Sequence, residues 1–421
     1  MKQRLLTCLW ALILLTSACA QKSTSHNKSA KDAEPVFNSK NRIQPGAENF
    51  KVYLPLLSGK RVALFANQTT VVNDSIHLVD ELRNIGVNIV KIFAPEHGFR
   101  GTADAGEKVD NSVDKKTGIQ VISLYGKKRK PSEEDMKDVD ILLFDIQDIG
   151  VRFYTYISSL EEFMESAVQF NKPLVVLDRP NPNGFYIDGP VLEKPFRSFV
   201  GMQAVPIVYG MTIGEYAKML AGENWLGSEF PGNKLRLTVI PCINYTHSSR
   251  YKLPVKPSPN LPDMASIYWY PSTCLFEGTV LSEGRGTDKP FQVFGHPDLP
   301  KNLYSFTPVS REGAKDPKHK DKLCFGWNIS GTPDKVLETI NNQIHLEYLL
   351  EAYKLFPEKN KFFIGKEGAK PTEYFFNKLS GNAKLMEQVK QQLTMAEIRR
   401  SWEPGLKEFK IIRKKYLLYE E

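Results

Sequence analysis

Amides, carboxylates, a histidine and an arginine follow four short apolar runs of the sequence, each at the point where the run ends. These polar residues are Asn67, Gln68, Glu96, His97, Asp145, Asp148, Asp178 and Arg179. Nearly continuous apolar runs of this length are typical of strands buried on both faces of a sheet. In open α/β sheets, ligands bind beyond the carboxyl ends of the strands. One Asp or Asn at such an end is an ordinary turn residue, but polar groups at four ends together predict a polar site.

The sequence lacks the short motifs of several common chemistries. No GxGxxG follows the first apolar run, and GxxxxGK[ST], GxSxG and HExxH are absent. Nucleotide binding, a serine nucleophile of the α/β-hydrolase type and a zinc site therefore lack their usual sequence support. Asp145 and Asp148 do not have the DxD spacing of a metal or phosphatase pair. We expect neither a metal nor a cofactor.

A site of carboxylates, amides, arginine and tyrosine without metal motifs suits a carbohydrate. Hydrolysis of a glycosidic bond needs a proton donor for the leaving oxygen and a second carboxylate as nucleophile or base. Burial or a like charge can keep one carboxyl group protonated. Glu96, on the loop that leaves a buried strand, is the candidate acid. The alternative is a loop carboxylate that binds His97 or Arg100 and only shapes the turn.

Two further carboxylates lie near an arginine in the second half of the chain. Glu277 and Glu283 could complete a catalytic pair, and Gly284 and Gly286 flank Arg285. Glycines on both sides allow a tight turn that presents the guanidinium to a cleft. Arginine binds carboxylates in a bidentate manner, so Arg285 could bind the carboxylate of an anionic sugar such as muramic acid. The alternative is an ordinary glycine-rich turn with a surface ion pair.

Strands and helices alternate along the first half of the chain. We expect strands at residues 61–66, 88–93, 120–124, 139–144 and 173–177, and helices at residues 75–85, with Asp74 as N-cap, 132–138 and 158–170. This alternation predicts right-handed βαβ units and a doubly wound, Rossmann-like α/β fold with a parallel sheet. A helix at residues 212–220 and a strand at residues 235–240 extend this domain.

The segment 254–262 contains four prolines, which predict a stiff connector and a domain boundary. We therefore expect a catalytic domain at residues 49–262 and a smaller, mixed α+β domain at residues 263–421 that completes the cleft. The second domain contains aromatic- and glycine-rich loops at residues 268–300. Helical segments follow at residues 333–350 and 383–402.

The N-terminus has the pattern of an export signal. Lys2 and Arg4 precede the apolar run 5–15, and small residues precede Cys19. This pattern resembles a bacterial lipoprotein signal, with residues 1–18 removed, Cys19 lipidated and residues 19–48 as a flexible tether. The expected location is a membrane-anchored lipoprotein that faces the periplasm. A plain secretory signal with an incidental cysteine is the alternative.

Composition excludes several other classes. The 421 residues carry a formal net charge of +8, but the basic clusters are short and flanked by acids, so we expect no nucleic-acid partner. Apolar residues make up 41% and charged residues 25%, which is ordinary for a globular protein. Cys242, Cys274 and Cys324 show no metal spacing and are expected to be buried small side chains.

Several segments together resemble a known family. They are residues 93–101 (FAPEHGFRG), 105–109 (AGEKV), 144–156 (FDIQDIGVRFYTY), 176–184 (VLDRPNPNG), 188–191 (DGPV), 210–215 (GMTIGE), 275–279 (LFEGT) and 284–287 (GRGT). In this order they resemble the NamZ family, which is glycoside hydrolase family 171 and was formerly a domain of unknown function. The resemblance covers residues 59–421.

The resemblance implies an exo-β-N-acetylmuramidase that releases N-acetylmuramic acid from the non-reducing ends of peptidoglycan-derived muropeptides or disaccharides. It implies a Rossmann-like domain, a smaller C-terminal domain and an active site in the cleft between them. Glu96 is then the first catalytic residue, and Glu277, Asp145 and Asp178 are candidates for the second catalytic group. The residues expected to bind substrate are His97, Asp148, Arg152, Tyr154, Tyr156, Arg179, Asn181, Glu283 and Arg285.

The chain departs from the family pattern at two places. Tyr209 stands where the family often has histidine, and a Gly-His-Pro sequence at residues 295–297 stands where a tryptophan is usual nearby. Two other functions remain open from the residues alone. One is a non-catalytic sugar-binding lipoprotein that feeds a transporter, and the other is an esterase, for which no serine motif is present.

Overall fold

The computed structural model describes residues 42–96, 98–100, 111–366 and 368–421. The expected signal, Cys19 and most of the expected tether lie outside these residues. Residues 43–421 form one compact unit. The expected boundary between residues 262 and 263 remains a prediction. In the described ranges, no helix combines the length and the apolar character needed to cross a membrane.

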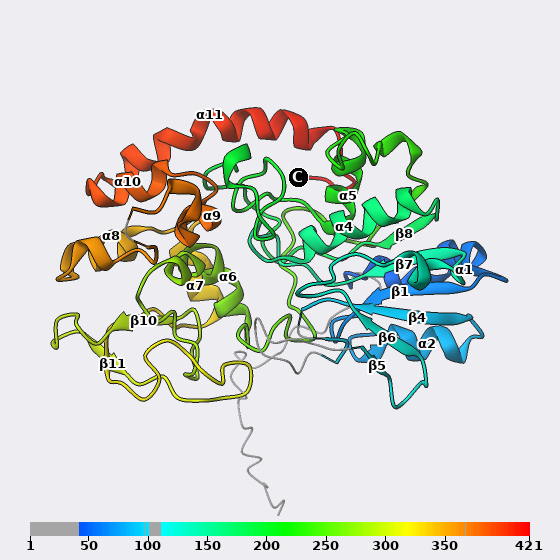
Figure 1. Ribbon diagram of the computed structural model, residues 1–421, viewed down its shortest axis with the longest axis horizontal. Helices are drawn as coiled ribbons and strands as arrows, with labels where there is room; N and C mark the ends of the chain where they lie inside the picture. Colours follow the sequence, from blue (N-terminus) through cyan, green and yellow to red (C-terminus); the bar gives the residue numbers. More distant parts are fainter. Residues whose placement is uncertain (1–41, 97, 101–110, 367) are drawn as a thin grey trace, which may run out of the picture. The chain divides into compact units, whose positions relative to one another are not determined.

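A seven-stranded sheet organises the first part of this unit. Its strands are β1 (Val62–Ala66), β4 (Ile89–Ala94), β5 (Ser112–Val113), β6 (Gln120–Ser123), β7 (Ile141–Asp145), β8 (Leu174–Leu177) and β9 (Leu237–Ile240). The strand order is β5-β6-β4-β1-β7-β8-β9. Neighbouring strands pair in parallel except for β5, which runs antiparallel to β6 at the edge. Figure 1 shows β6, β4, β1, β7 and β8 side by side in this order.

Helices cover both faces of the sheet. They are α1 (Phe50–Leu57), α2 (Leu78–Asn84), α3 (Glu133–Met136), α4 (Tyr156–Gln169) and α5 (Ile213–Gly222). Tyr53 of α1 and Leu82 of α2 pack in one buried cluster with alternate residues of the central strands. Phe163 of α4 and Tyr216 of α5 pack in a second cluster with the residues of the opposite face. The expected doubly wound α/β arrangement is therefore confirmed.

The helix expected at residues 75–85 is shorter than predicted. A small antiparallel hairpin, β2 (Val71–Val72) with β3 (Ile76–His77), takes up its first residues. Asp74 has a left-handed backbone with φ of 62° in the hairpin turn, so it does not cap the helix. His77 is the N-cap instead, because its Nδ1 accepts the backbone N–H of Val79 at 3.3 Å.

The second part contains a three-stranded antiparallel sheet, several helices and irregular segments. Its strands, in the order β10-β12-β11, are β10 (Val293–His296), β12 (Cys324–Asn328) and β11 (Tyr304–Phe306). Its helices are α6 (Met264–Thr273), α7 (Pro333–Ile340), α8 (Glu347–Leu355), α9 (Phe375–Ser380), α10 (Lys384–Lys390) and α11 (Met395–Lys414). Short 3₁₀ helices in residues 43–421 are η2 (Gly46–Glu48), η3 (Lys194–Phe196), η4 (Gly232–Lys234), η5 (Cys274–Gly278), η6 (Lys359–Lys361) and η7 (Pro371–Glu373). The expected mixed α+β class is confirmed.

Three details of the second part differ from the predictions. The start of the segment 268–300, expected to consist of loops, belongs to α6, which begins at a capping box formed by Asp263 and Ser266. The helix expected at residues 333–350 is divided into α7 and α8, because Asn341 adopts a left-handed backbone that ends α7. The helix expected at residues 383–402 is likewise divided into α10 and α11, with Gln392 at φ of 56° between them.

Buried polar contacts join the two parts. The guanidinium of Arg152 donates to the carbonyls of Pro190 and Val205 at 2.8 and 2.7 Å, and to Leu379 at 2.8 Å. Asp188 accepts two hydrogen bonds from Arg399 of α11 at 2.9 and 3.0 Å. Helix α11 extends from α10 towards α5 (Figure 1). The core cluster on the α4 face also continues into the second part, so both parts share one hydrophobic core.

Candidate active site

A pocket of about 230 Å³ lies at the carboxyl edge of the sheet. Residues from both parts of the chain line it: Glu96, Tyr125, Phe153, Tyr154, Thr155, Tyr156, Phe199, Val200, Ser258, Leu261, Tyr270, Glu277, Arg285, Phe291 and Phe375. Glu96 follows β4, and Tyr156 is the first residue of α4, which follows β7. Glu277 comes from η5, more than a hundred residues later. The structure therefore brings Glu96, Glu277 and Arg285 to a single pocket.

Glu96 is held by a tyrosine from the neighbouring strand end. Strands β4 and β6 pair in parallel, with Ala94 opposite Ser123. This register places Glu96 and Tyr125, each two residues beyond its strand, on the same rim of the sheet. The Tyr125 hydroxyl donates a hydrogen bond to Glu96 Oε1 at 2.8 Å. The bond restricts the rotamers of the carboxylate while the side chain still faces the pocket.

Aromatic rings form one wall of the pocket. Tyr154 packs edge to face on Tyr156 and Tyr270, with ring centroids 4.9 and 6.0 Å apart, and Tyr270 packs in the same way on Phe291 at 4.8 Å. The Tyr154 hydroxyl donates to the Pro257 carbonyl at 2.7 Å. Burial raises the pKa of both Tyr154 and Tyr156, so the phenols stay neutral. A wall of neutral rings with fixed geometry suits the apolar face of a sugar.

Arg285 lies between two carboxylates. Its Nη2 contacts Glu277 Oε1 at 2.6 Å, and its Nε contacts Glu283 Oε1 at 3.1 Å. Gly284 and Gly286 have φ of 84° and 80°, so the turn expected around Arg285 requires glycine on both sides. Burial disfavours the charge of Arg285, but the two carboxylates raise its pKa above the usual value. The guanidinium is therefore a permanent cation held beside the pocket.

Glu283 is buried and does not line the pocket. Its Oε2 lies 3.2 Å from Lys318 Nζ, and its Oε1 is the oxygen that contacts Arg285. Burial opposes the charge of this carboxylate, but Lys318 and Arg285 hold its pKa below the usual range. Glu283 therefore remains ionised and fixes the position of Arg285 in the pocket wall.

Asp145 and Arg179 form an ion pair inside the fold. Arg179 Nε and Nη2 donate to the two oxygens of Asp145 at 2.6 and 2.7 Å. Their side chains are 0% and 1% exposed, and neither residue lines the pocket. Asp145 is the last residue of β7, a strand with neighbours on both sides. The sequence proposed Asp145 as a catalytic group and Arg179 as a substrate-binding group. In the structure these two side chains bind each other in a bidentate manner.

Asp178 lies at the N-terminus of α5. It accepts hydrogen bonds from the Thr212 hydroxyl and the Gly214 N–H, both at 2.7 Å, and from the Tyr419 hydroxyl at 2.5 Å. Burial raises the pKa of this carboxyl to about 7. Its bonds all go to the protein, and it does not line the pocket.

Asp148 is enclosed by the fold as well. It accepts hydrogen bonds from the Gly150 N–H at 2.6 Å and from the hydroxyl of Tyr209, one of the two places where the sequence departs from the pattern it resembles. Burial raises the pKa of Asp148 to about 6. The neutral phenol thus supplies the donor that this buried carboxylate needs.

Two other residues expected to bind substrate contact backbone instead. Arg152 is fully buried on three carbonyls, and burial lowers its pKa to about 9. Asn181 donates to the Met211 carbonyl and accepts the Asn183 N–H, both at 2.8 Å. His97 lies outside the described residues. The structure thus brings only part of the expected set to the pocket: Glu96, Glu277, Arg285, Tyr154 and Tyr156.

Tyr125 and Tyr270 are among the pocket-lining residues that the expected set did not include. Tyr125 follows the expected strand 120–124 directly, so the same strand-end rule that selected Glu96 would have found it. Tyr270 lies in α6, a segment that was expected to be a loop. Among the described residues, no group of three or more His, Cys, Asp and Glu side chains is placed to hold a metal ion.

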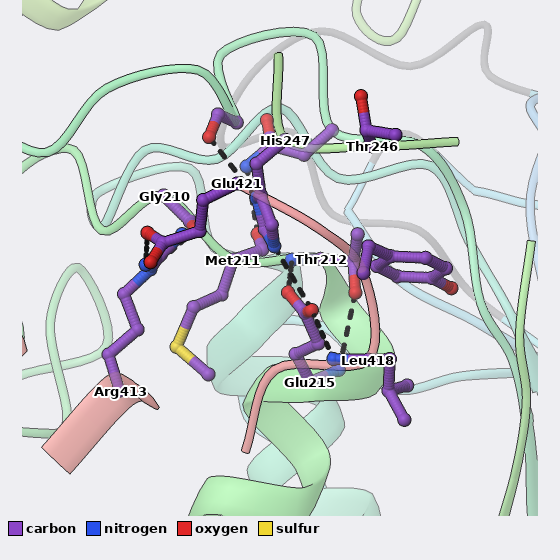
Figure 2. Close-up of polar contacts among 12 residues, drawn as sticks. Gly210, Met211, Thr212, Glu215, Thr246, His247, Arg413, Leu418 and Glu421 are labelled. Carbon is purple, nitrogen blue, oxygen red and sulfur yellow. Dashed lines mark hydrogen bonds and ion pairs between the residues drawn. The ribbon is translucent and has the colours of Figure 1, made fainter. Parts of the chain in front are cut away.

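A second polar network lies at the start of α5 (Figure 2). Glu215 accepts hydrogen bonds from His247 Nε2 at 3.1 Å, from the Thr212 N–H at 2.9 Å and from the Leu418 N–H at 2.7 Å. Arg413 donates from Nε to the Gly210 carbonyl at 2.8 Å. These contacts tie α11 and the residues that follow it to the start of α5, and none of the six residues lines the pocket that contains Glu96.

Comparison with known proteins gives consistent matches over nearly the whole chain. The family model described as exo-β-N-acetylmuramidase NamZ, N-terminal, matches residues 62–265, and the corresponding C-terminal model matches residues 268–419. The peptidoglycan β-N-acetylmuramidase NamZ of Bacillus subtilis (strain 168) is 36% identical over 427 residues, covering 96% of each chain.

Two crystal structures of DUF1343 family proteins from Bacteroides fragilis NCTC 9343 have similar folds. One has a TM-score of 0.80 and 45% identity, and the match covers 90% of this chain and 99% of that one. The other has a TM-score of 0.72 and 30% identity, and the match covers 90% and 100% of the two chains.

Proposed function

The chain belongs to the NamZ family of exo-β-N-acetylmuramidases, and we propose that the pocket containing Glu96 cleaves terminal N-acetylmuramic acid from peptidoglycan fragments. The protein is a glycosidase, as the resemblance of its motifs implied. The observation that supports this site is that Glu96, Glu277 and Arg285, which are distant in sequence, line one aromatic-walled pocket.

The three charged residues and the tyrosine wall of the pocket each have a role in this proposal. Glu96 donates a proton to the leaving oxygen, and Glu277 is the second carboxylate that glycoside hydrolysis requires. Arg285, whose side chain is 20% exposed, binds the lactyl carboxylate that distinguishes muramic acid from other amino sugars. The tyrosine wall packs on the sugar ring.

The substitution Glu96→Gln tests the role of the acid. On a disaccharide of N-acetylmuramic acid and N-acetylglucosamine, we expect kcat to fall by about 10²–10⁴-fold, the usual contribution of a general acid. On a 4-nitrophenyl muramide the fall should be smaller, because nitrophenolate leaves without a proton. Glu133→Gln is the matched control, since Glu133 is an exposed glutamate of α3 outside the pocket.

Two results would remove the assignment. Full activity of Glu96→Gln on the disaccharide would show that another group protonates the leaving oxygen. An equal loss on both substrates would indicate that Glu96 acts as nucleophile or base rather than as acid.

We also propose that the protein is an exported lipoprotein of cell-wall recycling, anchored through Cys19. The support is the sequence alone: Lys2, Arg4, the apolar run 5–15 and the small residues before Cys19. In a bacterial host, the wild-type chain should enter the membrane fraction and incorporate labelled palmitate, and Cys19→Ser should do neither. Palmitate incorporation by the Cys19→Ser variant would contradict the anchor.

A further inference from the structure

The ammonium group of Lys318 lies among backbone carbonyls of the segment that carries Glu277. Lys318 Nζ lies 3.0–3.2 Å from four carbonyl oxygens, those of Phe276, Glu277, Thr279 and Leu281. A fifth oxygen, Glu283 Oε2, lies at 3.2 Å. An ammonium has only three N–H groups, so the attraction to five oxygens is largely electrostatic. The arrangement is that of a monovalent cation inside an oxygen cage, with the cation tethered to the chain.

The neighbouring residues complete this clamp on residues 276–281. His319 Nε2 contacts the Val280 carbonyl at 2.6 Å, and the Gly278 carbonyl accepts the Ile364 N–H at 3.0 Å. All six carbonyls of the segment therefore have a partner. The segment includes the end of η5, where helix carbonyls have no partner within the helix. A cation at this position is also favoured by the helix dipole.

The same ammonium is connected to the pocket through side chains. Lys318 contacts Glu283, Glu283 contacts Arg285, and Arg285 contacts Glu277 at 2.6 Å. Charges alternate along this row. Lys318 therefore acts on Glu277 twice, through its backbone carbonyl and through the row of ion pairs. Lys318 itself does not line the pocket.

We propose that Lys318 is a positioning residue whose ammonium serves as a built-in monovalent cation, fixing the Glu277 carboxylate and the Arg285 guanidinium in the pocket wall. The proposal rests on the function proposed above for this pocket. In this proposal, the five oxygens around Lys318 Nζ require a compact cation between them. The covalent tether supplies that cation at a high effective concentration.

Two substitutions at Lys318 test whether the surrounding oxygens need a cation. Lys318→Ala leaves the five oxygens around an open space, whereas Lys318→Met fills much of that space with an apolar chain. We expect both to lose at least tenfold in kcat/KM on the muramic acid disaccharide. The Lys318 side chain is 28% exposed, so a small amine can reach the cage. Ethylammonium chloride should restore at least a third of the activity of Lys318→Ala and none of that of Lys318→Met, with tetramethylammonium chloride as the control for ionic strength and size.

Thermal melting gives a second measurement that does not depend on catalysis. Ethylammonium should raise the melting temperature of Lys318→Ala relative to tetramethylammonium, and should have no such effect on Lys318→Met or on the wild type. If the wild type failed to cleave muramides, the proposed function would fail while the melting data still tested the cage. Unchanged activity in both variants would overturn the proposal. Equal losses in both variants would also overturn it if ethylammonium changed neither the activity nor the melting temperature of Lys318→Ala.

Lys318→Arg provides the test if Lys318→Ala does not fold. It keeps the charge, but a planar guanidinium cannot point at five oxygens that surround one atom. We expect a loss of at least tenfold in kcat without a matching fall in melting temperature. Wild-type kcat in Lys318→Arg would show that the cage does not need a compact ammonium.

Discussion

The ion pair between Asp145 and Arg179 gives a prediction that separates structural roles from chemical ones. We consider Asp145→Asn, which keeps the shape of the side chain and removes its charge. The guanidinium of Arg179 then stays buried without a negative charge beside it. It keeps its hydrogen bond to the Val71 carbonyl at 3.0 Å. Removing one partner of a buried pair costs more than removing both, because the other charge is left without compensation.

The magnitude follows from the burial of the pair. The two side chains are 0% and 1% exposed, and two charge-assisted hydrogen bonds of 2.6 and 2.7 Å join them. Breaking such a pair costs about 3–5 kcal/mol of unfolding free energy. The double substitution Asp145→Leu with Arg179→Met leaves no buried charge. It should therefore be closer to the wild type than Asp145→Asn is.

Urea unfolding followed by tryptophan fluorescence measures this cost by linear extrapolation. Asp140→Asn is the matched control, because Asp140 also makes a bidentate pair with an arginine, Arg61, with side chains that are 34% and 46% exposed. We expect its unfolding midpoint to stay close to that of the wild type, since solvent screens the pair. The folded Asp145→Asn protein should also keep kcat within a few-fold on a muramide substrate.

The opposite pattern would refute this reasoning. If Asp145→Asn lost a hundredfold in kcat at an unchanged unfolding midpoint, Asp145 would belong to the reaction and the ion pair would not be structural. If the double variant Asp145→Leu with Arg179→Met had a lower unfolding free energy than Asp145→Asn, the guanidinium would have a stabilising role beyond neutralising the carboxylate.

Further predictions concern the acid, the pH dependence of stability and the arginine turn. Tyr125→Phe removes the hydroxyl that donates to Glu96, and we expect kcat to fall about tenfold, for a bond worth about 1.5 kcal/mol, with KM little changed. Burial raises the pKa of Glu161 from 4.5 to about 8, so the folded state binds more protons than the unfolded state and loses stability as pH rises through this window. Between pH 5 and pH 8.5, roughly this window, the urea midpoint of Glu161→Gln should fall less than that of the wild type, and equal slopes would contradict this. Gly284→Ala should lower both the melting temperature and the activity, because the added Cβ would lie 2.4 Å from the Val293 carbonyl. Gly227→Ala is the control, since Gly227 has φ of 91° but open space around it. We expect this control to lower the melting temperature slightly and to leave the activity unchanged.

The sequence predicts the central sheet well because its strands are buried on both faces. Such strands appear as apolar runs that end abruptly, and β1, β4, β6, β7 and β8 lie within two residues of the predicted bounds. Complete burial also explains why the sequence did not predict helix α6. All ten of its residues are buried and it contains Pro271, so its sequence has no polar face from which a helical period can be recognised.

The candidate site was only partly predictable because the strand-end rule does not say which way a carboxylate points. Asp145 ends β7 and meets Arg179 inside the fold, whereas Glu96 and Tyr125 lie two residues beyond β4 and β6 and reach the pocket. Arg285 was found through its flanking glycines. The cage around Lys318 leaves no local pattern, because its oxygens come from backbone carbonyls that any residue carries.

The contacts of Arg152 have a consequence for how this protein can evolve. Within the described ranges its guanidinium contacts no carboxylate, and its three carbonyl acceptors come from segments up to 227 residues away in sequence. A gene cut at the proline-rich connector would separate Arg152 from one of its three acceptors, the Leu379 carbonyl, and would expose the shared apolar core on both fragments. The two halves are therefore expected to be inherited as a single module, and shuffling either one onto a foreign neighbour should give a chain that does not fold.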